Sequence, residues 1–234
     1  MNIETFILEL KKIGICITEE QIKKLDEFYK LLIEWNKKIN LTRIIEKEEI
    51  YLKHFYDSLT LIKGIDLYKN YNICDVGSGA GFPGIVLKII FPNLKITLVD
   101  SLNKRVIYLN SIIKELKLKD IVAIHSRMED FSRENEEVFD YITARAVADL
   151  NVLLEISVRA LKKGGSMVFM KANCQSEIEN SENALNKLSC KMKKIIEFEL
   201  PIEKSNRTLL IIQKNNKTSS VFPRNIDKIR KKPL

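Results

Sequence analysis

The chain has 234 residues, with 39 Lys and Arg against 31 Asp and Glu, which gives a formal net charge of +8. This length predicts one large domain, or one domain with a small extension, that buries most of its apolar surface without disulfide bonds. The hydrophobic content of 45% excludes a wholly disordered chain. No apolar run approaches the ~18–20 residues of a membrane span, and Glu4 and Glu9 interrupt the N-terminal apolar stretch, which is not typical of a secretory signal. We therefore expect a cytoplasmic protein without a membrane partner.

The number and spacing of the cysteine and histidine residues argue against a metal site. The four cysteines are scattered, no C-x-x-C pair occurs, and the chain has only two histidines. A zinc site would need more ligands clustered in the sequence. We expect reduced thiols and no bound metal.

The first 65 residues are predicted to be helical and to pack on the domain that follows them. Residues 2–13 carry apolar side chains at helical spacing, and a second helix is expected from residue 19 to about residue 39. Thr18 and Gln21 have the spacing of a capping box at the start of that second helix. A third helix is expected over residues 47–63, ending at Gly64.

From Tyr71 onward, short apolar strands alternate with helices. The predicted strands cover residues 71–77, 95–100, 121–126, 139–146, 166–172, 193–201 and 207–214. Such alternation predicts an α/β fold, with a mostly parallel, seven-stranded sheet covered by helices on both faces. The last two strands are close enough for an antiparallel hairpin at one edge. Residues 66–213 form this domain in our interpretation, and residues 214–234 form a basic tail.

The segment DVGSGAGFPG, residues 75–84, follows a strand and opens a helix. Its glycines allow a tight turn and the close approach of a ligand to the backbone. Asp100 ends the next strand, about 20 residues after Gly81, where a carboxylate can accept hydrogen bonds from both hydroxyls of a ribose. These features predict a ligand that contains a nucleoside.

Two cofactor classes fit the glycines. Gly79, Gly81 and Gly84 formally match the dinucleotide fingerprint, so an NAD-dependent oxidoreductase is one alternative. However, Asp75 precedes the first glycine by two residues, and D-x-G-x-G-x-G resembles the loop of class I S-adenosylmethionine-dependent methyltransferases. An acidic residue suits a ligand with an ammonium and a sulfonium but no phosphate. The terminal strand hairpin also resembles that methyltransferase fold.

The sequence as a whole resembles one family, the RsmG (glucose-inhibited division protein B, GidB) methyltransferases. The matching segments are WNKKINLT (35–42), HFYDSL (54–59), the glycine loop, VDSLNKR (99–105), TARA (143–146) and the tail FPR…KKPL. The family makes N7-methylguanosine in 16S ribosomal RNA. The resemblance therefore implies S-adenosyl-L-methionine as cofactor, and 16S ribosomal RNA or the small ribosomal subunit as partner. We expect a monomer.

The resemblance also implies site residues. The expected cofactor-binding residues are Asp75, Gly77, Gly79, Gly81, Phe82, Asp100, Met128, Glu129 and Arg145. Met128 and Glu129, in the loop after the third strand, are expected near the adenine, and Asp100 near the ribose. Arg145 is also expected to position the target base, and it is our only candidate catalytic residue. Guanine N7 has a free lone pair and carries no proton, so its methylation needs no general base.

RNA contacts are expected from basic residues outside this cofactor site. The candidates are Lys171, Arg224, Lys228, Arg230, Lys231 and Lys232. Residues 214–234 hold seven basic residues and one acidic residue, a net +6 of the chain's +8, so we interpret them as a mobile electrostatic arm for the RNA backbone. A solvated tail without this role is the alternative. A non-catalytic RNA-binding module is a further alternative for the whole chain, but the intact glycine loop and Asp100 argue against it.

Four polar residues of the helical region remain open at this stage: Asn36, Asn40, His54 and Asp57. They line the RNA-facing mouth of the site, or they cap helices and tie this region to the sheet. We favour the structural role for Asn36 and Asp57.

Overall fold

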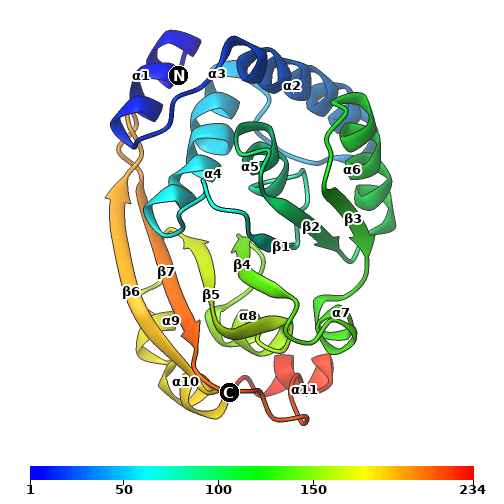
Figure 1. The fold of residues 1–234 in the computed structure, drawn as a ribbon, viewed down its shortest axis with the longest axis vertical. Coiled ribbons are helices and arrows are strands. Elements are labelled where there is room, and N and C mark those ends of the chain that lie inside the picture. The colour runs from blue at the N-terminus through cyan, green and yellow to red at the C-terminus, as the bar shows by residue number, and fades with distance from the viewer.

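A seven-stranded sheet forms the centre of the protein, as a computed structural model covering residues 1–234 shows (Figure 1). The strand order is β3-β2-β1-β4-β5-β7-β6. The strands are β1 (Asn72–Val76), β2 (Lys95–Asp100), β3 (Ile121–His125), β4 (Phe139–Arg145), β5 (Leu161–Lys171), β6 (Cys190–Glu199) and β7 (Asn206–Lys214). Strands β1 to β5 run parallel, and β7 pairs antiparallel with both β5 and β6. The predicted α/β class and the antiparallel edge are confirmed.

Helices cover both faces of this sheet, and each face has its own apolar core (Figure 1). One layer contains α1 (Ile3–Lys12), α2 (Glu19–Ile39), α3 (Lys47–Ile50), α4 (Asp57–Leu59), α5 (Gly84–Ile90) and α6 (Asn103–Glu115). The other contains α7 (Met128–Glu134), α8 (Leu150–Ser157), α9 (Gln175–Glu179), α10 (Glu182–Lys187) and α11 (Ile226–Lys231). None of these helices is long and apolar enough to cross a membrane.

The N-terminal helices lie on the sheet because α2 presents one apolar face. Leu25, Phe28 and Leu32 are completely buried, and α2 packs against α5 and α6. Thr18 and Gln21 form both hydrogen bonds of the expected capping box, which places the start of α2. Residues far apart in the sequence thus share one core, and the helical layer covers the first βα units.

The segment expected as one helix over residues 47–63 is continuous but changes its winding. A π-helical turn, Tyr51–Tyr56, follows α3, and a 3₁₀ turn, Thr60–Lys63, follows α4. Aromatic packing accompanies the π turn, since Phe55 contacts the rings of Tyr51 and Phe28. A π turn widens the helix by one residue and is frequent at functional sites. Here it carries His54.

Besides α9, two short helices have no counterpart in the sequence-based expectation. Met128 and Glu129, expected in a loop, begin α7, and α11 lies in the tail that was expected to be mobile. Both helices are mostly polar and hold few apolar residues. The apolar side chains that anchor them are Met128 and Phe131 in α7 and Ile229 in α11, all of which are buried. Packing against the domain, rather than periodicity, therefore determines them.

Candidate functional site

The glycine loop leaves β1 in a conformation that requires glycine. Gly77, Gly79 and Gly81 have φ values of +64°, +55° and +92°. A Cβ atom at Gly77 would lie 2.7 Å from Cγ2 of Val147. The Gly77 N–H donates to the carbonyl of Val99 at 2.8 Å, so the loop is tied to the end of β2.

Two buried carboxylates hold this loop. Asp75 is completely buried, and its Oδ2 accepts a hydrogen bond from the N–H of Gly84 at 3.0 Å. Burial raises the pKa of Asp75 to about 7. Asp75 lines neither of the cavities described next, so the structure gives it a supporting position behind the loop. Asp100 Oδ2 accepts from Gly79 N–H, and Oδ1 accepts from Leu102 N–H, both at 2.9 Å.

Two cavities meet at Gly77. The larger, of about 530 Å³, lies between the glycine loop and the helical layer; its lining includes Thr42, His54, Gly77, Gly79, Phe82, Arg145, Lys171 and Arg207. The smaller, of about 160 Å³, is lined by residues that include Gly77, Ser101, Ser126, Met128, Glu129 and Val147. Most of the expected cofactor residues line one cavity or the other. Gly81 and Asp100 line neither, but Asp100 lies between them, since Ser101 lines one and Arg105 the other.

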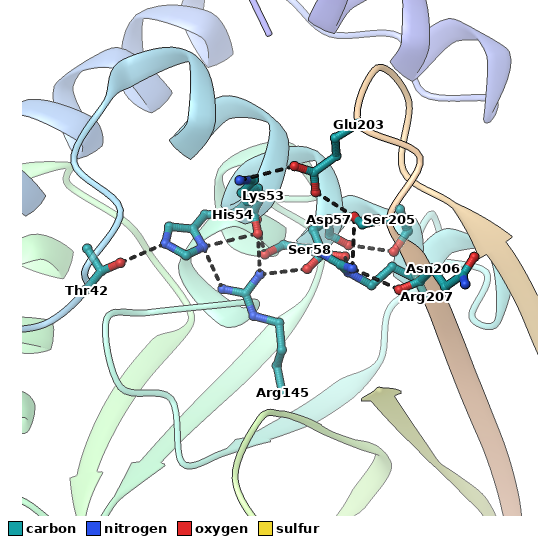
Figure 2. Close-up of polar contacts among 11 residues, drawn as sticks. Thr42, Lys53, His54, Asp57, Ser58, Arg145, Glu203, Ser205, Asn206 and Arg207 are labelled. Atoms are coloured by element: carbon teal, nitrogen blue, oxygen red, sulfur yellow. Dashed lines mark hydrogen bonds and ion pairs between the residues drawn. The ribbon is translucent and has the colours of Figure 1, made fainter. Parts of the chain in front are cut away.

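Arg145, at the end of β4, reaches into the helical layer (Figure 2). Its Nη1 donates to the carbonyl of Lys53 and to Oδ2 of Asp57, both at 3.1 Å. Its Nη2 lies 3.3 Å from Nδ1 of His54, and its guanidinium carbon lies 5.0 Å from the ring centre of Phe82. Burial lowers the pKa of Arg145, and the ion pair with Asp57 opposes that shift. At least two of its five N–H groups, Nε–H and one on Nη2, remain without a partner in the protein.

Asp57 bridges two arginines from different strands. Its Oδ2 accepts from Arg145, and its Oδ1 accepts from Nε of Arg207 at 3.0 Å (Figure 2). The Asp57 side chain is only 6% exposed, so the pairing compensates a carboxylate taken out of water. This is the structural role favoured for Asp57, because it ties the helical layer to the sheet. Sequence reasoning missed Arg207, since no local motif surrounds it.

His54 is a neutral member of the same cluster. Its ring stacks on Phe82 with ring centres 4.5 Å apart, and its Nε2 lies 3.0 Å from Oγ1 of Thr42. Nδ1 lies 3.1 Å from the carbonyl of Lys53, which can only accept, and faces Nη2 of Arg145, which can only donate, so the tautomer of the neutral ring decides which of the two Nδ1 bonds. Burial, followed by the positive charge of Arg145, lowers the pKa of His54 to about 3.

This shift predicts a pH dependence of stability. The unfolded chain binds a proton at His54 near pH 6.5, whereas the folded protein binds it only near pH 3, so stability is lost as the pH falls through this window. Between pH 7 and pH 5 we expect His54 to lower the free energy of unfolding by about 2 kcal/mol. Urea denaturation at both pH values should show a smaller loss for His54→Gln than for the wild type. His125→Gln, at the exposed second histidine, is the control; equal losses in both variants would contradict the prediction.

Two of the expected RNA-binding residues instead form internal ion pairs. Lys171 Nζ donates to Oε2 of Glu177 at 2.7 Å and to the carbonyl of Ala148 at 2.8 Å. Arg224 donates from Nε and Nη2 to the two oxygens of Glu155, both at 2.7 Å, and Glu155 is completely buried. The structure therefore corrects the expectation for this pair, because a neutralised, internally bonded charge attracts a phosphate weakly.

The tail is also not the mobile arm that its composition suggested. Ile229 is completely buried, α11 packs on α8, and the expected start of the tail, Lys214, is the buried last residue of β7. Lys228 and Lys231 on α11, and Lys232 directly after it, are exposed and free of ion pairs, so they remain candidates for RNA contact. Arg230 lines the smaller cavity.

The other polar candidates of the helical layer have local roles. Asn36 Oδ1 accepts from the N–H groups of Leu41 and Thr42, and its Nδ2 donates to the Thr42 carbonyl. Asn40 ends α2 in the left-handed conformation, with φ +49°. Together they shape the loop that brings Thr42 to the cavity. The four cysteines are free, and the chain contains no group of three or more His, Cys, Asp or Glu side chains that could hold a metal ion.

The fold is similar to that of solved S-adenosylmethionine-dependent methyltransferases. A SAM-dependent methyltransferase from Aquifex aeolicus superposes with a TM-score of 0.54 at 18% identity, covering 77% of this chain and 97% of the other. A 16S rRNA (adenine(1408)-N(1))-methyltransferase from Catenulisporales acidiphilia superposes with a TM-score of 0.54 at 12% identity, covering 68% and 89%. At these identities the likeness concerns the fold alone.

The sequence comparisons are more specific. The family model for rRNA small subunit methyltransferase G (GidB) matches residues 21–210. Proteins named ribosomal RNA small subunit methyltransferase G from Bacillus thuringiensis (strain Al Hakam) and from a strain of Bacillus anthracis are each 45% identical over 237 residues, covering 100% of this chain and 99% of theirs. The chain belongs to the rRNA small subunit methyltransferase G family, as its motifs predicted.

Proposed function

We propose that this protein transfers the methyl group of S-adenosyl-L-methionine to N7 of a guanine in 16S ribosomal RNA. The observation that carries the proposal is the pair of cavities that meet at Gly77, in a chain related over its full length to ribosomal RNA methyltransferases. The smaller cavity suits the adenosine half of the cofactor, and the larger suits its methionine half together with the target base. Residues of one chain line both cavities, so we expect a monomer to be active. We expect it to act in the cytoplasm, where ribosomal subunits are found.

The residues present fit this cofactor. Glu129 is 5% exposed, and its Oε1 is buried without a hydrogen-bond partner, which leaves an acceptor free for the amino group of adenine. Each oxygen of Asp100 accepts one backbone N–H, and Oδ2 also lies 3.5 Å from Nη1 of Arg105, so Oδ1 keeps a second lone pair for a ribose hydroxyl. The glycines at positions 77 and 79 expose backbone without side chains at the junction.

Methyl transfer to guanine N7 requires the protein to position the two reactants and requires no proton transfer. The cofactor supplies an activated methyl group on a sulfonium, and guanine N7 already has a free lone pair. The larger cavity offers no free general base, because its histidine, His54, has a pKa of about 3, is neutral and already contacts Thr42 and Arg145. The two unpaired N–H groups of Arg145 would donate to guanine O6 or to a flanking phosphate. Donation to N7 itself would block the nucleophile. In-line positioning and exclusion of water can lower a barrier by up to ~7–11 kcal/mol in favourable cases.

The direct test is to map N7-methylguanosine in 16S ribosomal RNA from cells with and without this protein. We expect one methylated guanine to disappear without the protein and to return when the purified protein and S-adenosyl-L-methionine are added to the unmodified small subunit. Binding measured in parallel with S-adenosyl-L-methionine and NAD separates a methyltransferase from an oxidoreductase. Cofactor binding without methyl transfer to either naked RNA or subunits would instead favour a non-catalytic RNA-binding module.

A further inference from the structure

The smaller cavity has one wall that belongs to the C-terminal helix. Most of its lining comes from the ends of β1 and β2 and from the segments that follow β3 and β4. The remaining wall is formed by Ile226 and Arg230, which lie one turn apart on α11. Residues four apart on a helix point to the same side, so α11 turns this pair toward the cavity.

The domain holds α11 firmly in this place. Arg224, just before α11, forms a bidentate ion pair with buried Glu155. It also donates to the carbonyl of Lys232, which follows α11. Arg133 of α7 donates to the carbonyls of Pro223 and Arg224, at 2.8 and 3.1 Å. Ile229, on the helix itself, is completely buried. The wall is therefore a fixed part of the folded domain.

Two polar side chains of the cavity lining have no partner within the protein. Oε1 of Glu129 is buried and accepts no hydrogen bond, and Arg230 forms no ion pair or side-chain hydrogen bond within the protein. Val152 and Ile226 provide apolar surface in the same lining. A buried acceptor, an unpaired guanidinium and apolar walls suit a flat aromatic base with an amino group.

We propose that α11 is part of the cofactor site, with Ile226 and the guanidinium of Arg230 covering the adenine ring whose amino group donates to Glu129. The inference rests on the proposed function, because it assumes that the smaller cavity receives the adenosine of S-adenosyl-L-methionine. It reassigns Arg230 from RNA contact to cofactor binding. It also explains why a tail of such basic composition is fastened to the domain.

The test compares Arg230→Gln with Lys232→Gln, which removes a charge from the same tail outside the cavity. Calorimetric titration of each purified protein with S-adenosyl-L-methionine, and separately with adenosine, measures the contribution of each residue. We expect Arg230→Gln to weaken the binding of both ligands ~5–20-fold, since the lost contact is to their shared base. Lys232→Gln should bind both as the wild type does. Arg230→Lys should weaken both ligands as well, because an ammonium lacks the planar face that stacks on a ring.

The outcomes separate the inference from the proposed function. Wild-type affinity of Arg230→Gln for both ligands, or full recovery by Arg230→Lys, would overturn the role of Arg230. Weaker binding of 16S ribosomal RNA with unchanged adenosine binding would overturn it as well, and would return Arg230 to the RNA surface. A thermal melt of each variant shows that the fold is intact. If the wild-type protein bound no S-adenosyl-L-methionine, the proposed function itself would fail.

Discussion

Replacing Arg145 with alanine is expected to lower kcat for methyl transfer by at least ~100-fold. The change removes the two N–H groups left to hold the base or its phosphate, and losing a single positioned donor at a reacting centre typically costs about 10²–10³-fold. It also leaves the Lys53 carbonyl and Oδ2 of Asp57 without their partner. Because Arg207 still pairs with Asp57, we expect only about 1–3 kcal/mol of lost stability.

Methyl transfer to unmodified small subunits, with titration of S-adenosyl-L-methionine, tests this prediction. Arg159→Gln is the matched control, because Arg159 is also an ion-paired arginine, bound to Glu136, but lines neither cavity. It should lose some stability and keep kcat. Arg145→Lys should restore little activity, since a single ammonium cannot reach three acceptors and the base together. Normal turnover and normal cofactor affinity in Arg145→Ala would remove this residue from the site.

Gly84→Ala is expected to destabilise the fold by about 3–5 kcal/mol. A Cβ atom at this position would overlap Cδ2 of Leu98 in β2 and would lie 2.8 Å from Oδ2 of Asp75. Both neighbours are completely buried, so neither can move aside without opening the core. The substitution therefore overpacks the core and strains the hydrogen bond from the backbone N–H of residue 84 to a buried carboxylate.

Urea denaturation at pH 8 measures this effect. Gly14→Ala serves as the control, because Gly14 has φ +82° but nothing within 4 Å of an added Cβ. It should cost only about 1–2 kcal/mol, for the left-handed backbone alone. Because Gly84 is outside the left-handed region, a loss for Gly84→Ala no larger than that for Gly14→Ala would contradict the overpacking of α5 against β2.

The framework of the cofactor site was predictable from local sequence. The order of strand, glycine loop, helix and Asp100 depends on turn chemistry and on periodicity within a few residues. The capping box at Thr18 is likewise a four-residue signal, and the structure contains it as expected. The role of Asp75 was only partly predictable, because its spacing revealed its place near the loop but not that its carboxylate faces Gly84 from behind.

The C-terminal tail shows that residue composition alone does not predict what its charged side chains contact. Its net charge of +6 suggested an RNA arm, yet Arg224 is used internally and Arg230 faces a cavity. Charge counts do not reveal a partner such as Glu155, which is buried in α8 and 69 residues away in the chain. Only the exposed lysines of α11 still fit the original interpretation.

By itself, the sequence determined the α/β alternation, the glycine loop, Asp100 and the family motifs, because each is encoded by neighbouring residues. Only the tertiary structure decided the cluster in which Asp57 pairs with Arg145, 88 residues later, and with Arg207, 150 residues later. The physical reason is the sheet order: β5 lies between β4 and β7, and the helical layer extends over their ends, so Asp57 reaches both strands at once. Ion pairs between distant elements leave no periodic pattern in the chain, and they exist only once the layers have packed together.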